Sequence, residues 1–172
     1  MFVKISPKEI SENPIKLIGQ DWMLISAGSP EKFNSMTASW GGIGFMWNKP
    51  VAFAVIRPTR YTFEFVESRK RFTLSFFSQN YKKALGIFGS KSGRDCDKVA
   101  ESGLTPFFTE SGAPAYEEAK LILDCSAIYS QTLDESAFLD SEALKKWYSS
   151  DPLHKLYVAE INDVLIRRQP EV

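Results

Sequence analysis

The order of apolar and polar positions along the chain predicts six β-strands. Each strand is a run of apolar or alternating residues between turn signals, and the six runs are residues 22–28, 35–40, 51–56, 71–77, 121–130 and 156–166. The run 51–56 is continuously apolar between Pro50 and Pro58, which is typical of a buried strand. The turn-forming residues 29–32 separate the first two runs, so these runs are expected to pair as a hairpin.

Short helices are expected between the strands. Apolar residues at helical spacing predict them at residues 14–19, 59–69, 81–89, 95–102 and 141–149. The first 13 residues are expected to form a leader to the first helix. The strands do not alternate with helices in a regular βαβ pattern, which argues against a Rossmann fold. A mostly antiparallel, mainly β arrangement with short helices, closed or nearly closed into a barrel, is therefore expected.

Composition limits the classes of protein to which the chain can belong. A length of 172 residues predicts a single domain, 1–172, that buries enough apolar surface to need no disulfide or metal for stability. The net charge is zero and no basic stripe is present, so nucleic acid is not an expected partner. The chain shows no membrane span, no signal-peptide pattern and no CxxC, so we expect a cytoplasmic protein with inert cysteines. One histidine excludes a multi-histidine metal site.

Candidate chemistry is concentrated between residues 34 and 60. A polar run, 34–40, precedes the glycine cluster Gly41-Gly42-Ile43-Gly44. This cluster is not a dinucleotide fingerprint, because no GxGxxG opens a helix here. A flexible connection between strands, or close packing of backbones, explains the glycines as well as a ligand site does.

The segment Arg57-Pro58-Thr59-Arg60-Tyr61-Thr62 is a candidate anion site. A helix is expected to begin here, capped by Thr59 or Thr62, and its first amides would carry partial positive charge. Two arginines beside those amides suit a phosphate, although ordinary surface salt bridges would explain them equally well. The loop 90–94, with its hydroxyls and cations, is a second candidate, and the alternative is a solvated turn.

His154 is the only imidazole, and it lies just before the last predicted strand. A surface position is the simpler interpretation, but His154 is also the one side chain expected to titrate near neutral pH. Nucleophilic catalysis has little support, because the chain lacks GxSxG and neither Cys96 nor Cys125 has a histidine close in sequence.

An ordered set of motifs resembles the flavin reductase-like family of FMN-binding split barrels, and within it the flavoredoxin-like branch. The resemblance spans about residues 22–166. Its motifs are Asn34-x-Met36-Thr37-x-Ser39-Trp40-Gly41-Gly42, Arg57-Pro58-x-Arg60-Tyr61-Thr62, Phe72-x-x-Ser75-Phe76, Ser92-Gly93-Arg94-Asp95-x-Asp97-Lys98, and His154 followed by the strand 156–161.

The resemblance implies a six-stranded Greek-key split β-barrel, usually a homodimer, with FMN near the subunit interface. The strand 36–40 would follow the flavin ring and ribityl chain, and Arg57, Arg60 and Thr62 would lie near the phosphate. The implied cofactor-binding residues are Asn34, Met36, Thr37, Ala38, Ser39, Trp40, Arg57, Pro58, Arg60, Thr62, Ser90, Lys91 and Ser92. His154 would contact the flavin or the nicotinamide, but the Gly-Asp that precedes this histidine in the family is absent.

The function implied by the resemblance is that of an FMN-dependent oxidoreductase that passes electrons from NAD(P)H to a flavin or a redox partner. The altered segment before His154 keeps a second hypothesis open, an FMN-binding electron carrier or sensor with no nicotinamide turnover of its own. A third hypothesis is a split-barrel module for another planar ligand, in which the thirteen phenylalanines serve only the core.

Overall fold

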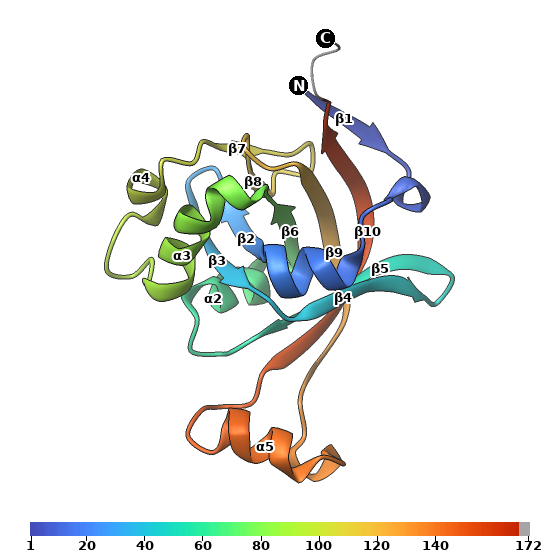
Figure 1. The fold of residues 1–172 in the computed structure, drawn as a ribbon, viewed down its shortest axis with the longest axis vertical. Helices are drawn as coiled ribbons and strands as arrows, with labels where there is room; N and C mark the ends of the chain where they lie inside the picture. The colour runs from blue at the N-terminus through green and yellow to red at the C-terminus, as the bar shows by residue number, and fades with distance from the viewer. Residues whose placement is uncertain (169–172) are drawn as a thin grey trace.

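A computed structural model describes residues 1–168 of the chain and shows a strongly curved antiparallel sheet with short helices around it (Figure 1). The strands of the main sheet follow the order β3 (Lys32–Ala38), β2 (Met23–Ser29), β6 (Arg71–Phe76), β9 (Leu121–Thr132), β10 (Lys155–Arg167), β5 (Lys49–Ile56) and β4 (Gly41–Met46), and β1 (Phe2–Ile5) pairs with β10. All six predicted strands lie in this sheet, so the mainly β, antiparallel expectation is confirmed.

Strand β10 pairs with three strands and contains two irregularities that contribute to the curvature of the sheet. Its first half pairs with β5, its last residues pair with β1, and its pairing with β9 shifts register twice, between Val158 and Ala159 and between Ile161 and Asp163. Such bulges bend a strand and increase its twist. Strands β3 and β4 are the two end strands of this order, and the link 39–40 joins them directly, so the curved sheet brings its two ends together.

The described residues contain ten strands, four more than the sequence predicts. The missed strands are β1, β4, β7 (Pro106–Phe108) and β8 (Pro114–Tyr116). The glycine cluster is not a flexible connection but the first part of β4, and it escapes detection because glycine leaves no side-chain pattern. At Gly41, with φ 146°, an added Cβ would lie 2.3 Å from the Phe53 carbonyl oxygen, so close packing of backbones requires the glycine.

The helices occur near their predicted positions, with shifted boundaries. They are α1 (Pro14–Lys16), α2 (Tyr61–Arg69), α3 (Lys82–Ser90), α4 (Lys98–Ser102) and α5 (Ser141–Tyr148), with π-helix η2 (Leu17–Asp21) and the 3₁₀ turns η1 (Pro7–Glu9), η3 (Gln79–Tyr81) and η4 (Glu135–Ala137). Helix α4 begins three residues later than predicted, because the Asp97 side chain accepts a bond of 3.0 Å from the Ala100 amide and caps it.

Two hydrophobic clusters hold these elements together. The larger one lies inside the curved sheet and includes Met23, Phe72 and Tyr157. The smaller one packs α3 against the other face, around Phe88 and Tyr116. Helix α5 stands apart from both, on a long excursion between β9 and β10 (Figure 1). None of the helices within residues 1–168 is long and apolar enough to cross a membrane.

Candidate functional site

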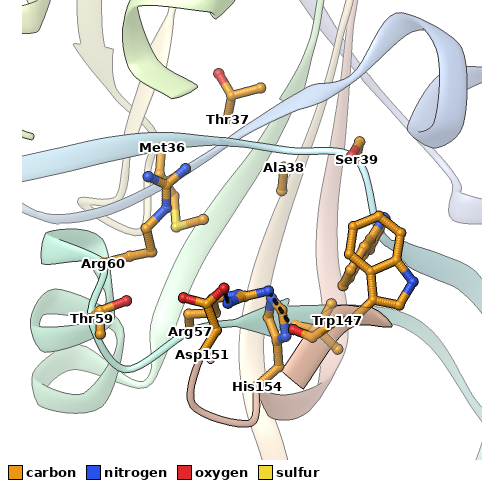
Figure 2. A pocket seen from close by; sticks show the side chains of 12 residues that line it. Met36, Thr37, Ala38, Ser39, Arg57, Thr59, Arg60, Trp147, Asp151 and His154 are labelled. Carbon is orange, nitrogen blue, oxygen red and sulfur yellow. Dashed lines mark hydrogen bonds and ion pairs between the residues drawn. The ribbon is translucent and has the colours of Figure 1, made fainter. Parts of the chain in front are cut away.

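Two adjoining cavities lie beside β3, and they share Met36, Thr59 and Arg60. Cavity 1 encloses about 400 Å³, and its walls are Met36, Thr37, Ala38, Ser39, Trp40, Val55, Arg57, Thr59, Arg60, Trp147, Asp151 and His154 (Figure 2). Cavity 2 encloses about 130 Å³, and its walls are Asn34, Met36, Thr59, Arg60, Tyr61, Thr62, Phe88, Ser90, Lys91, Ser92, Gly93 and Lys98. Together they have the size of a typical small-molecule site.

One side of cavity 1 is the open backbone edge of β3, an end strand of the sheet. The Ser35 carbonyl points away from β2, because it accepts a bond of 2.6 Å from Lys98 Nζ. Backbone alternation places the N–H and C=O of Thr37 on the same outer side as those of Ser35. The Thr37 hydroxyl is bonded to the Leu85 carbonyl of α3. Unpaired backbone groups on this edge can therefore bond the polar rim of a flat ligand.

The outer end of cavity 1 is aromatic. The ring of Trp40 meets the ring of Trp147 edge-on, with centroids 4.8 Å apart and an angle of 84°. Trp40 also lies 5.2 Å from the His154 ring, and Tyr148 Oη lies 2.8 Å from His154 Nδ1. Burial and the charge of nearby Arg57 lower the pKa of His154 to about 4, so the imidazole is neutral at pH 7.

Arg57 lies between two residues of the excursion that carries α5, as the dashed lines in Figure 2 show. Its Nη1 pairs with Asp151 Oδ2 at 2.7 Å, and its Nη2 donates to the Trp147 carbonyl oxygen at 3.1 Å. The guanidinium also lies 5.7 Å from the centre of the Tyr148 ring. Arg57 therefore connects the end of β5 to the segment after α5.

The first turn of α2 lines cavity 2. The helix begins at Tyr61, and its N-cap, Arg60, makes no side-chain capping bond, so the predicted threonine cap is wrong. The Thr62 hydroxyl instead accepts a bond of 2.8 Å from Asn34 Nδ2. Because no side chain caps this terminus and its first residues line the cavity, its amides can bind an anion there.

Arg60 and Lys98 bring positive charge into cavity 2, and within residues 1–168 neither forms a salt bridge. Arg60 Nη2 donates to the Gly89 carbonyl at 3.0 Å. Lys98 is only 5% exposed, and its burial, with the nearby charge of Arg60, lowers the pKa of its amine to about 8. A buried lysine and a partly buried arginine that lack a carboxylate partner in the described residues suit an anionic ligand.

The loop after α3 forms one wall of cavity 2. Ser92 Oγ accepts a bond of 3.2 Å from the Arg94 amide, and Ser90 Oγ donates to the Gly86 carbonyl at 2.8 Å. The Lys91 amine pairs with Glu101, so Lys91, unlike Arg60 and Lys98, has a carboxylate partner. A Cβ added at Gly93 would lie 2.1 Å from Asn34 Oδ1, so the loop packs directly on a buried residue of the cavity.

The structure gathers every predicted binding residue except Pro58 around these two cavities. Pro58 lies in the turn between β5 and α2 and lines neither of them. The prediction missed eight wall residues, which are Val55, Thr59, Tyr61, Phe88, Gly93, Lys98, Trp147 and Asp151. Lys98 ends one of the motifs quoted above, so that motif could have indicated it. Trp147 and Asp151 had no comparable signal, because only the folded chain brings them to β5.

Comparison with known proteins identifies a family and a fold for this chain. The family model described as "Flavin reductase like domain" matches residues 16–171. Flavoredoxin from Methanosarcina acetivorans is 21% identical, with a TM-score of 0.69 over 88% of this chain and 71% of that one. An FMN-binding domain of a flavin reductases-like enzyme from Shewanella baltica is 18% identical, with a TM-score of 0.69 over 96% and 77%.

An NADH:FAD oxidoreductase from Streptomyces globisporus is 16% identical, with a TM-score of 0.64 over 87% of this chain and 76% of that one. At these identities the likeness shows the fold, which confirms the predicted flavin reductase-like split barrel, although with more strands than the predicted six. No curated protein matches the chain.

Proposed function

This chain belongs to the flavin reductase-like domain family, and from that premise we propose that it binds FMN and passes electrons from NAD(P)H through the flavin to a flavin or a redox partner. The single observation that carries the proposal is that cavity 1, along the open edge of β3, adjoins the cationic cavity 2 and shares Met36, Thr59 and Arg60 with it. A flavin mononucleotide has the matching chemistry, a planar ring at one end and a phosphate at the other.

The donor groups in the two cavities fit FMN. The phosphate would lie in cavity 2, near Arg60, Lys98 and the uncapped first turn of α2. Ser90, the last residue of α3, and Ser92 in the following loop would cover it. The arrangement also explains why Lys98 is buried without a carboxylate partner in the described residues, since the ligand would supply the negative charge.

The ring would lie along the open edge of β3 in cavity 1. Backbone groups around Thr37 and the hydroxyl of Ser39 would bond its polar rim, while Met36 supplies an apolar surface. The bound flavin would supply hydride and electron transfer, and the protein would supply binding, orientation and exclusion of water. The neutral His154 and the unpaired amides of the edge contribute hydrogen bonds without net charge.

The test is spectroscopic and uses the full chain. Protein purified with FMN should be yellow, with an absorption band near about 450 nm. Under anaerobic conditions, NADH or NADPH should then bleach this band, and the faster of the two is the preferred donor. A colourless protein that fails to bind added FMN would contradict the proposal outright.

A second candidate function has a specific observation in its favour. His154 is 8% exposed, and its Nδ1 is bonded to Tyr148. It is preceded by Asp151-Pro152-Leu153 and not by the Gly-Asp that precedes this histidine in the family. One ring nitrogen of His154 is therefore already bonded within the protein, which favours a role for this residue other than binding a nicotinamide. If FMN binds but neither NADH nor NADPH bleaches it, while dithionite does, the protein is an electron carrier or sensor.

Two further parts of the proposal concern the assembly and its location. We propose a homodimer, as the family resemblance implies, which size-exclusion chromatography with light scattering would test. We also propose a cytoplasmic location, because Cys96 and Cys125 are unpaired thiols, as a reducing compartment would keep them. Fractionation of the source cells tests the location.

A further inference from the structure

The excursion between β9 and β10, residues 133–154, leaves the sheet and returns to it at one point. We call it the α5 arm. The Leu133 amide donates to the His154 carbonyl at 2.9 Å and closes its base. Helix α5 has no buried residue, and the arm extends away from the barrel in Figure 1. Its position against cavity 1 must therefore come from a small number of contacts near its C-terminal end.

Arg57 makes several of those contacts. It bonds the Trp147 carbonyl and the Asp151 carboxylate, and it stacks near the Tyr148 ring. Both of its terminal nitrogens are thus engaged with the arm, and its side chain is only 19% exposed. An arginine binds a phosphate through two parallel N–H···O bonds only when its terminal nitrogens are not engaged elsewhere. The terminal nitrogens of Arg57 are bonded to the α5 arm. Arg60 and Lys98, in contrast, have no anionic partner in the described residues.

Trp147 is the residue that the arm brings to the cavity. It lies at the aromatic end of cavity 1 (Figure 2), where its ring meets the ring of Trp40 edge-on. Its side chain is 42% exposed, so much of the indole is not covered by protein. An indole that lines a cavity can contact an aromatic ring placed in that cavity.

We propose that Trp147 contacts the isoalloxazine ring of the bound flavin, and that Arg57 is the positioning residue that holds Trp147 there and is not a ligand of the phosphate. This inference rests on the proposed function and assigns a ring-contacting residue outside the motifs of the barrel. It makes the α5 arm part of the flavin site.

The test compares the affinities for FMN and for riboflavin, which has the same ring but no phosphate. Titrations of the full chain would use Trp147→Ala, Arg57→Ala, the double variant and Arg60→Ala. Trp147→Ala and Arg57→Ala should each weaken both ligands by the same factor, roughly five- to tenfold for the loss of an aromatic contact. The double variant should be no weaker than either single one. Arg60→Ala should weaken FMN and leave riboflavin nearly unchanged.

Two further variants complete the design. Lys145→Ala, on the same helix and away from Arg57, is the matched control and should change neither affinity. Asp151→Asn removes the charge of the partner of Arg57 and weakens this contact, so it should give a smaller, equal loss for both ligands even if Arg57→Ala folds poorly. Thermal unfolding of each variant shows whether the barrel remains intact.

Several results would overturn the inference while the proposed function stands. They are a loss confined to FMN in Arg57→Ala or in Asp151→Asn, additive losses in the double variant, or unchanged affinities in Trp147→Ala. A wild-type chain that binds neither FMN nor riboflavin would contradict the proposed function itself, and the inference with it.

Discussion

At the residue scale, Arg60 and Lys98 are the two side chains that distinguish a phosphate site from an ordinary polar cavity. Arg60→Ala should weaken FMN binding about ten- to a hundredfold, because a hydrogen bond to a charged group contributes ~1.5–3 kcal/mol. Titration with FMN and riboflavin measures the difference. Equal weakening of the two ligands would show that Arg60 supports the fold through its bond to Gly89 and does not meet the phosphate.

Lys98 predicts a pH dependence of FMN binding. Burial and Arg60 hold its pKa at about 8 in the free protein. A bound phosphate favours the ammonium form and raises that pKa, so affinity is complete below pH 8 and falls as the pH rises through 8. FMN dissociation constants measured from pH 7 to 9.5 should show this fall.

Two controls belong with the Lys98 experiment. Riboflavin should bind with little change over the same pH range, since it has no phosphate. Lys98→Met keeps an unbranched chain of similar length but removes the charge, so it should weaken FMN binding and abolish the pH dependence. A Lys98→Met variant with the same pH profile as the wild type would assign that profile to another group.

At the scale of elements, cavity 2 depends on how the loop after α3 packs on β3. Gly93→Ala would drive a methyl group into Asn34, whose side chain is bonded to Thr62 and is 7% exposed. The loop must lift or that bond must break, at a cost of ~1–3 kcal/mol. We therefore expect weaker FMN binding and a lower melting temperature.

Gly86→Ala is the matched control for Gly93→Ala. It lies in α3, where an added Cβ meets no atom within 4 Å, so it should leave FMN binding unchanged and slightly stabilise the helix. If Gly93→Ala binds FMN as tightly as the wild type does, the loop is not part of the flavin site.

At the scale of the whole molecule, Glu67 joins α2 to β10. Burial alone would raise the pKa of Glu67, but hydrogen bonds from Tyr157, Lys155 and Lys70 outweigh it and lower the pKa to about 2. A carboxylate with a depressed pKa stabilises the fold above its unfolded pKa, near 4.5, and this stability is lost as the pH falls towards 2.

Glu67→Gln tests that connection. At pH 7 the variant should be less stable than the wild type by ~1–3 kcal/mol, because it loses charged hydrogen bonds. The difference should shrink as the pH falls from 5 to 2, which urea unfolding at several pH values would measure. A difference that is constant over this range would show that the carboxylate charge is not responsible.

Local pattern determined much of the fold. The buried strand β5, the alternating strand β6 and the long strands β9 and β10 were all predictable, because each run of side chains carries its own period. Elements without such a period were missed. The glycines of β4 have no side chains, and β7 and β8 are only three residues long.

The sequence by itself determined the family and most walls of the candidate site, because β3, the start of α2 and the loop after α3 carry motifs that are local in the chain. Only the tertiary structure decided how the two arginines differ. Arg57 and Asp151 are 94 residues apart, and their ion pair exists because β5 and β10 are neighbours in the sheet. The same pairing brings Trp147 to cavity 1, and no local pattern encodes a contact between segments so distant in sequence.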